Sequence, residues 1–410
     1  MTIELTRPPR LAGPAWSASS AALVEQLAHS HAVGTPVRIV GSGTWLDAGR
    51  PVTADRAIHT RETAGVIEYT PGDLVITVGA GTTLDEVSAI TREHDQWLAL
   101  DPFGSNSGTV GATVATASSG PLASGAGRVR DLTLGLTMLA SDGSAIHIGG
   151  RVVKNVAGFD LVRLATGAFG TLGIITEVSL RLHALPDVDQ TFAVVIDLEV
   201  DPATVSATPS LSVYARLGLR ALSFIALELV SANVIRTFDP AAPTGHAWVL
   251  LARIAGNKDR ALAQRAILEP LGFVMEISND VWKAVRGMDG SHSAVARVSD
   301  APSRLRQTLA AVQNALSAAG IGNASLCATP STGRVRVAVP FENDDEVSIR
   351  SLVKSFHAVG ASVVWERLPA DCWAWVAPAA TDAVSLRIRD AFDPHHMLNR
   401  GIFGPMGGHA

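Results

Sequence analysis

The 410-residue chain has little cysteine, little charge of either sign and no long apolar run. Its two cysteines, Cys327 and Cys372, stand far apart, and the sequence contains no C-x-x-C pair. The chain therefore cannot by itself supply the thiolates of an iron–sulfur cluster. A disulfide framework is not expected, although these two residues could still form a single pair.

Charged residues make up 17% of the chain, and the formal net charge is -5. This charge balance does not indicate a basic surface that binds nucleic acid or a polybasic patch that binds a membrane. The amino-terminal residues lack the apolar stretch of a signal peptide, and no run reaches the ~20 residues that cross a bilayer. The sequence predicts a cytoplasmic protein without direct membrane insertion, which would meet the inner membrane only peripherally, through partner subunits.

The usual nucleotide-binding signatures are missing. Neither G-x-G-x-x-G nor a Walker sequence occurs, and Gly79-Ala80-Gly81-Thr82 is only half of a dinucleotide fingerprint. The sequence therefore contains no motif that indicates binding of NAD or of a P-loop nucleotide. The helical stretch after this turn has Thr82 or Thr83 as its expected N-cap.

Glycine and small polar residues are abundant in residues 101–186, beside alternating apolar stretches. This segment begins DPFGSNSGTVGATVATASSG and continues to GIITEVSLRL. Side chains this small let the backbone approach a bulky ligand and offer amide N–H groups to it. An earlier turn, GSGT at residues 41–44, follows the apolar run PVRIV and could hold phosphate oxygens in the same way. The pattern favours a long polyphosphate cofactor.

The order of these motifs carries a family resemblance. The strings GTVGA, RVRDLTLG, ASDGS, KNVAGFDL and GTLGIITEV resemble the FAD-binding domain shared by vanillyl-alcohol oxidase and p-cresol methylhydroxylase. Within that group the chain is most similar to the FAD-binding subunit of glycolate oxidase, and the resemblance returns at Phe392–Phe403. The alternative is an unrelated glycine-rich α/β domain.

The resemblance implies an α+β fold with a two-subdomain FAD-binding domain of the p-cresol methylhydroxylase type. The glycine motifs become scarce after Pro186, and helices with apolar stripes then alternate with strands. We therefore expect an FAD-binding domain at 1–186, an α+β second (cap) domain with a mainly antiparallel sheet at 187–380, and a segment at 381–410 that returns to the first domain.

The resemblance also implies which residues contact FAD. Residues 41–44 would form the first pyrophosphate loop, and residues 109–112 the second, with Ala112 where the family often has glycine. The expected cofactor-binding residues are Gly41, Ser42, Gly43, Thr44, Asp101, Pro102, Gly104, Ser105, Ser107, Thr109, Gly111, Ala112, Thr116, Ser118, Arg128, Ile174, Ile175 and Asn399. The two isoleucines are alternatives for one role, a backbone contact with the nucleotide half of FAD.

Several polar residues have two interpretations. Asn155 and Asp160 are expected to stabilise a local turn rather than to contact the cofactor directly. Lys154 is expected either to lie near the pyrophosphate or to be solvated. One of Arg128 and Arg130 is expected near the cofactor. Asn399 either contacts the flavin or fixes its own turn.

Some flavoproteins of this fold tether the flavin through a histidine near the first loop. Here the loop GSGTWLDAGR contains none, and His31 and His59 only flank it, so we expect non-covalent FAD. The family's signature for a metal site that acts on hydroxy acids, H-x-G-D-G-N-x-H, is also missing. The adjacent His395 and His396 are expected to be solvated, and no metal site is expected.

Four arginines on predicted strands of the second domain are candidates for binding a substrate carboxylate: Arg253, Arg297, Arg334 and Arg336. Strand arginines pair more often with acids or solvent, so no residue is assigned as catalytic. The sequence predicts an FAD-binding subunit of a glycolate-oxidase-like 2-hydroxy-acid dehydrogenase complex. By resemblance, that complex also contains a second flavoprotein subunit and an iron–sulfur subunit. One alternative is a self-sufficient FAD-dependent oxidase of a hydroxy acid, alcohol or sugar, and another is a structural subunit without flavin.

Overall fold

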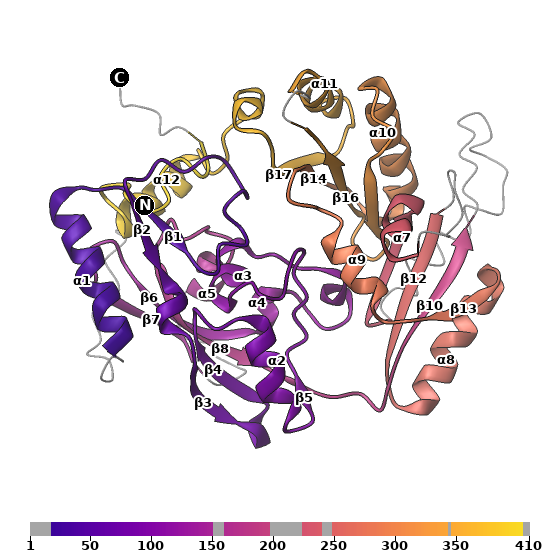
Figure 1. Cartoon of the computed structure of the whole chain (residues 1–410), viewed down its shortest axis with the longest axis horizontal. Helices are drawn as coiled ribbons and strands as arrows, with labels where there is room; N and C mark the ends of the chain where they lie inside the picture. Colours follow the sequence, from indigo (N-terminus) through magenta and orange to yellow (C-terminus); the bar gives the residue numbers. More distant parts are fainter. Residues whose placement is uncertain (1–17, 151–159, 197–223, 240–247, 343–345, 405–410) are drawn as a thin grey trace, which may run out of the picture. The chain divides into compact units, whose positions relative to one another are not determined.

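The computed structural model describes residues 18–150, 160–196, 224–239, 248–342 and 346–404 (Figure 1). The chain divides into two compact units. The first consists of residues 1–119, 127–185 and 377–410, and the second of residues 120–126 and 186–376. The boundaries expected from the sequence lay after residues 186 and 380, and residues 120–126 were expected in the first domain.

The first unit contains a five-stranded antiparallel sheet in the order β3-β4-β8-β6-β7. Its strands are β3 (Val66–Thr70), β4 (Val75–Gly79), β6 (Thr133–Leu139), β7 (Ala145–Gly149) and β8 (Ile174–Arg181). Two small sheets accompany it: β1 (Val37–Val40) pairs in parallel with β2 (Arg56–His59), and β5 (Gln96–Trp97) pairs with β9 (His183–Ala184). The helices are α1 (Ala18–Val33), α2 (Leu84–Arg92), α3 (Val110–Thr116), α4 (Val129–Leu132), α5 (Leu161–Ala165) and α12 (Ala383–Phe392), with short 3-10 turns η1 (Thr60–Thr63) and η2 (Pro71–Asp73).

The start of α2 shows how local sequence sets an element. Thr83 accepts a hydrogen bond from the amide of Glu86, and the Glu86 carboxylate accepts one from the amide of Thr83 at 2.7 Å. This reciprocal pair is a capping box, which satisfies two amides that a helix otherwise leaves unpaired. It confirms one of the two expected N-caps, and Asp85 adds a favourable charge in the first turn.

The carboxyl-terminal segment packs back into the first unit. The amide of Val37 donates to the carbonyl of Met397 at 2.8 Å, and Val37 forms a parallel bridge with Leu398. Met397 and Leu398 are buried with Leu23, Leu27 and other residues of α1 and β1 in one apolar cluster. The tail therefore extends the small sheet of β1 and β2.

The second unit has an eight-stranded sheet in the order β13-β10-β12-β11-β15-β16-β14-β17. Every pair of neighbours in it is antiparallel, which confirms the expected cap-domain architecture. Its strands are β10 (Val188–Ile196), β11 (Ala226–Ser231), β12 (Trp248–Gly256), β13 (Val274–Ile277), β14 (Ser293–Ser299), β15 (Ser325–Thr329), β16 (Arg334–Pro340) and β17 (Ser362–Arg367). The inserted residues 120–126 carry a short 3-10 turn, η3 (Pro121–Ser124), against β11.

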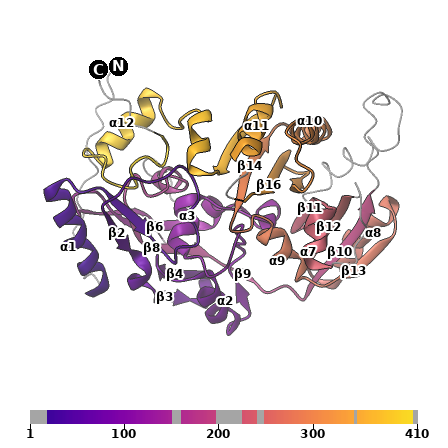
Figure 2. The same ribbon diagram turned by 45° about the horizontal axis from the view of Figure 1, so that its top comes forward.

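Helices cover this sheet on its apolar side. Figure 2 shows α10 (Leu305–Ala318) and α11 (Glu346–Phe356) lying together beside β14 and β16. Their buried residues join alternate residues of the strands in one large core, for example Val312 with Val337 and Phe356 with Trp365. The remaining helical elements are α7 (Ala232–Phe238), α8 (Lys258–Leu268), α9 (Val281–Gly287), η6 (Glu269–Leu271), η7 (Pro302–Arg304) and η8 (Ala370–Trp375).

Backbone contacts from the turn after β4 fix the position of α3. The amide of Val110 donates to the carbonyl of Thr82, and the amide of Gly111 donates to the carbonyl of Ala80, both at 2.8 Å. A Cβ placed on Gly111 would lie 2.7 Å from the Ala80 Cβ and 3.0 Å from its carbonyl oxygen. Gly111 is therefore needed for this approach of two backbone segments, whatever it contributes to a ligand.

We predict that Gly111→Ala destabilises the protein, although alanine is the better helix former. Overpacking costs ~1–3 kcal/mol, which exceeds the gain of ~0.8–1 kcal/mol from helix propensity. The thermal midpoint should fall by several degrees, measured by circular dichroism on the chain without added cofactor. Gly72→Ala is the matched control, because a Cβ at Gly72 would meet nothing within 4 Å. An unchanged or raised midpoint for Gly111→Ala would contradict this packing argument.

Candidate cofactor site

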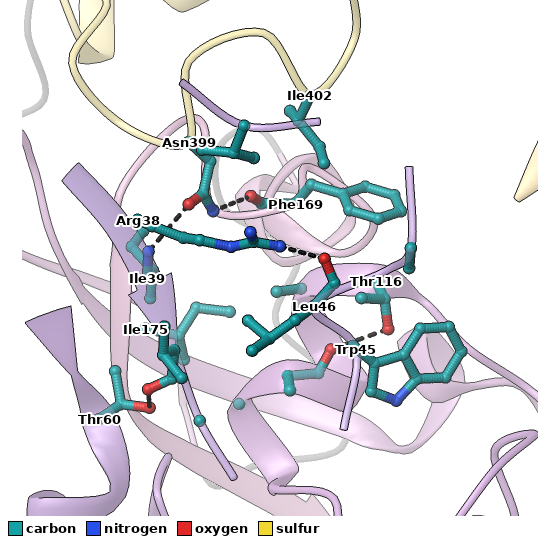
Figure 3. Close-up of a pocket in the computed structure, with 18 of the residues that line it drawn as sticks. Arg38, Ile39, Trp45, Leu46, Thr60, Thr116, Phe169, Ile175, Asn399 and Ile402 are labelled. Atoms are coloured by element: carbon teal, nitrogen blue, oxygen red, sulfur yellow. Dashed lines mark hydrogen bonds between the residues drawn. The ribbon is translucent and has the colours of Figure 1, made fainter. Parts of the chain in front are cut away.

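A pocket opens in the first unit between β1, the loop after it, α3, the start of β8 and the carboxyl-terminal tail (Figure 3). Its space is about 760 Å³, including the open mouth. The lining residues are Arg38, Ile39, Val40, Gly41, Gly43, Thr44, Trp45, Leu46, Ala48, Val52, Thr60, Gly111, Ala112, Ala115, Thr116, Phe169, Gly170, Gly173, Ile175, Asn399 and Ile402.

The loop after β1 contributes backbone donors to this pocket. Among the described residues, the amides of Ser42, Gly43 and Thr44 donate to no hydrogen-bond acceptor. Gly43 has a φ of +82°, in the left-handed region where glycine is favoured. Successive amides freed by such a turn form a concave cradle for an anion. The first loop therefore has the chemistry expected of a phosphate-binding turn.

Amides of the second expected loop, unlike those of the first, form hydrogen bonds within the protein. Thr109 is fully buried and caps α3 by accepting from the amide of Ala112 at 3.2 Å. Since the amides of Val110 and Gly111 are also bonded internally, the first turn of α3 uses its donors within the protein. Ala112 and Thr116, which are four residues apart on α3 and so share one face of the helix, line the pocket. Any contribution of α3 to a cofactor thus comes more from its surface than from free amides.

The two loops lie directly against each other. A Cβ on Gly41 would approach the Thr109 hydroxyl to 2.4 Å, so only glycine allows the first loop to sit beside the cap of α3. A Cβ on Gly108 would come within 3.2 Å of the Thr44 hydroxyl. One wall of the pocket is therefore formed by two segments, residues 41–44 and 108–109, which are some 65 residues apart in sequence.

Asn399 connects the tail to both sides of the pocket. Its side-chain oxygen accepts from the amide of Ile39 at 2.9 Å, and its side-chain nitrogen donates to the carbonyl of Phe169 at 2.7 Å. Its φ of +44° is a left-handed conformation that asparagine tolerates. Of its two interpretations, the fixing of the turn is visible in these contacts, and Asn399 also lines the pocket.

Arg38 lines the pocket and was not among the cofactor-binding residues expected from the sequence. Among the described residues that line the pocket, it is the one ionisable side chain. Its guanidinium lies in the pocket and donates to the carbonyl of Leu46, as Figure 3 shows. Alternation along β1 places Arg38 beside the GSGT turn, and this position could have identified it as a candidate for binding an anion.

The structure brings some of the expected residues together and leaves others apart. Those that line the pocket are Gly41, Gly43, Thr44, Gly111, Ala112, Thr116, Ile175 and Asn399. The expected residues outside this lining are Ser42, Asp101, Pro102, Gly104, Ser105, Ser107, Thr109, Ser118, Arg128 and Ile174. Of the two isoleucines, Ile175 lies at the pocket and Ile174 is buried against α1 and the tail.

The polar cluster near residue 155 is only partly visible. Lys154 and Asn155 lie outside the described residues. Asp160 caps α5 by accepting from the amide of Arg163 at 3.2 Å, and it also pairs with the Arg163 side chain. Arg128 stands at the N-cap of α4, where its amide donates to Asp131 at 3.0 Å.

Other chemistry in the described residues is limited. Cys327 and Cys372 are both free thiols and buried. Burial raises the pKa of Cys327 well above its usual range, and the neighbouring Glu228 carboxylate raises it further.

No group of three His, Cys, Asp or Glu side chains within the described ranges could hold a metal ion. Every helix in that part of the chain is too short or too polar to cross a lipid bilayer.

Comparison with known proteins agrees with this geometry. Residues 14–149 match the family described as FAD binding domain. The chain is 38% identical over 169 residues to glycolate oxidase subunit GlcE of Escherichia coli K12, which covers 41% of this chain and 48% of that protein. It is 33% identical over 148 residues to a D-lactate dehydrogenase of Archaeoglobus fulgidus, covering 36% of this chain and 33% of that protein. These matches therefore span less than half the length of either curated relative.

The fold has counterparts among solved structures. A structure of p-cresol methylhydroxylase with substrate bound aligns with a TM-score of 0.73 at 14% identity, covering 96% of this chain and 89% of that one. At this low identity the similarity concerns the fold alone. The family match over residues 14–149 supports an FAD-binding domain in this segment with FAD as its cofactor, and the fold of the chain is similar to that of p-cresol methylhydroxylase.

Proposed function

We propose that this chain is the FAD-binding subunit of a multi-subunit dehydrogenase that oxidises glycolate or a related 2-hydroxy acid. The two curated relatives described above are named for glycolate and D-lactate, and one of them is a subunit by name. Both substrates carry a hydroxyl on the carbon next to a carboxylate. When bound, FAD supplies the two-electron chemistry that such an oxidation needs.

The residues of the pocket fit this cofactor. The free amides of residues 42–44 are donors for phosphate oxygens, and Arg38 supplies positive charge beside them. The remaining lining is apolar or neutral, which suits the rings of a dinucleotide. We infer that the first loop and Arg38 hold the pyrophosphate, and that Ala112, Thr116 and Ile175 form the neutral wall.

One observation favours a partner-dependent enzyme. Oxidation of a 2-hydroxy acid needs a cation for the carboxylate and a base for the hydroxyl proton. Among the described residues that line the pocket, no His, Asp, Glu or Lys is present. The base must then come from another part of the chain or from a second subunit. By resemblance, the expected partners are a second flavoprotein subunit and an iron–sulfur subunit, since this chain lacks a C-x-x-C pair for electron transfer.

We expect FAD to be held without a covalent bond, because no His, Cys or Tyr occurs among the described lining residues. Acid precipitation of the purified, FAD-loaded chain should leave a yellow supernatant and a colourless pellet. Flavin that stays on the precipitated protein would contradict this expectation. A chain that cannot be loaded with flavin at all would support the alternative of a structural subunit.

Arg38→Gln should weaken FAD binding by about 10- to 100-fold, since a hydrogen bond to a charged group is worth ~1.5–3 kcal/mol. Riboflavin, which has no phosphate, should bind the variant and the parent chain alike. Both constants can be measured by titrating flavin fluorescence at two salt concentrations. Arg56→Gln is the matched control, because Arg56 is an exposed arginine on β2 outside the pocket lining. Equal FAD affinities for Arg38→Gln and the parent chain would exclude this role.

The FAD-loaded chain alone should oxidise 2-hydroxy acids slowly. Positioned acid–base catalysis contributes ~10²–10⁴-fold, so bleaching of the flavin band by glycolate or either lactate under anaerobic conditions should be slower by that factor than in the purified complex. Rapid bleaching of the isolated chain would instead indicate a self-sufficient oxidase. Absence of bleaching by all three acids in the complex would exclude this substrate class.

A further inference from the structure

The eight-stranded sheet of the second unit has one apolar face and one polar face. Alternate residues of each strand, such as Val335 and Val337 on β16, belong to the core under the helices. The register places the intervening residues opposite one another on the other face: Arg336 lies between Cys327 of β15 and Arg297 of β14. Three of the four arginines considered from the sequence can now be told apart by their partners on this face.

Arg253 and Arg336 are already occupied. Arg253 donates two hydrogen bonds to the Asp189 carboxylate, at 2.7 Å and 2.6 Å. Arg336 donates two to Asp289, at 2.9 Å and 2.5 Å, and a third to Glu366 at 2.6 Å. Both guanidinium groups are therefore paired closely with carboxylates of the protein, and Arg336 is buried. Neither is available to bind a small carboxylate.

Arg297 differs from these two. Its Nε lies 3.4 Å from a Glu366 oxygen, and the described residues provide no hydrogen bond to its guanidinium. Its side chain is 34% exposed. Val364, directly opposite on β17, is 42% exposed, so this part of the polar face is open to solvent. No hydrogen bond to a described residue therefore occupies the terminal amino groups of Arg297.

Glu366 cannot neutralise Arg297 fully, because it is shared. Burial alone would raise the pKa of Glu366, but the guanidinium groups of Arg336, Arg297 and Arg334 hold it below its usual range. The carboxylate is therefore an anion, and its shorter contact is with Arg336 rather than with Arg297. Its contact with Arg297 is made at Nε rather than at the two terminal nitrogens of that guanidinium.

We propose that Arg297 is the residue that binds the carboxylate of a small organic acid, with Glu366 and Arg336 as its positioning residues. A guanidinium group can donate two parallel hydrogen bonds to one carboxylate. Arg297 stands on a strand, so the sheet fixes the backbone that carries its guanidinium. The choice of a 2-hydroxy acid as the ligand rests on the proposed function. The site itself is defined by the geometry of β14, β16 and β17.

The test uses the full FAD-loaded chain and oxalate, a non-oxidisable dicarboxylate that resembles glycolate. Isothermal titration should show binding to the parent chain, at least tenfold weaker binding to Arg297→Gln, and partial recovery in Arg297→Lys, which keeps the charge but loses the fork. Arg304→Gln is the matched control, since Arg304 is exposed and pairs only loosely with Asp300 at 3.4 Å. Circular dichroism and FAD content should be equal in all four proteins.

The outcomes separate this inference from the proposed function. No oxalate binding to the parent chain, or equal binding to Arg297→Gln, would overturn the carboxylate site. That result would leave the proposed function intact if glycolate still bleaches the flavin in the complex. Arg297-dependent binding of oxalate together with an unreactive complex would support the site and exclude 2-hydroxy acids as substrates. A raised KM for glycolate with an unchanged kcat in Arg297→Gln would support both.

Discussion

Close approach of backbone segments at glycine positions is the constraint on which the pocket of the first unit depends. Gly41 lies against the Thr109 hydroxyl and Gly111 against Ala80, while a Cβ on Gly170 would come within 3.0 Å of the Asn399 side chain. Any side chain at these three positions would separate the walls of the pocket. The glycines thus act first on the protein itself, by bringing loops and helix together. Among the described residues, the amides of the turn at residues 42–44 stay free of hydrogen bonds within the protein.

The carboxyl-terminal tail completes that arrangement from the far end of the chain. Asn399 bridges Ile39 and Phe169, and Leu398 extends the sheet of β1. The buried Asp393 accepts from the amide of Leu398 at 2.8 Å and so fixes the turn that presents Asn399. The pocket is therefore formed by segments from both ends of the sequence, and its shape depends on this long-range closure.

The second unit shows how buried charges are accommodated on a strand face. Burial would lower the pKa of Arg336, but Glu366 and Asp289 raise it instead, so the guanidinium stays charged in the sheet. An unpaired charge at that depth would be costly, whereas a paired and hydrogen-bonded one is tolerated. The same carboxylate, Glu366, also lies 3.4 Å from Nε of Arg297, whose side chain is 34% exposed.

The sequence alone predicted much of this protein because the relevant signals are local or lie in ordered motifs. Apolar stripes after Pro186 indicated helices in the second domain, and Thr82 or Thr83 was expected to begin a helix. The ordered glycine motifs indicated the FAD-binding fold, and the alternating strands of the second unit indicated a mainly antiparallel sheet.

Tertiary structure alone decided which donors remain available. The amides of Val110 and Gly111 are bonded to the turn after β4, a contact that no local pattern specifies. Arg38 entered the pocket because the tail and the first loop close around β1, and residues 120–126 joined the second unit through contacts with β11. Likewise, Arg253, Arg297 and Arg336 look alike in sequence. They differ because the acids beside them come from distant strands and loops, and the free energy of an ion pair depends on that three-dimensional placement.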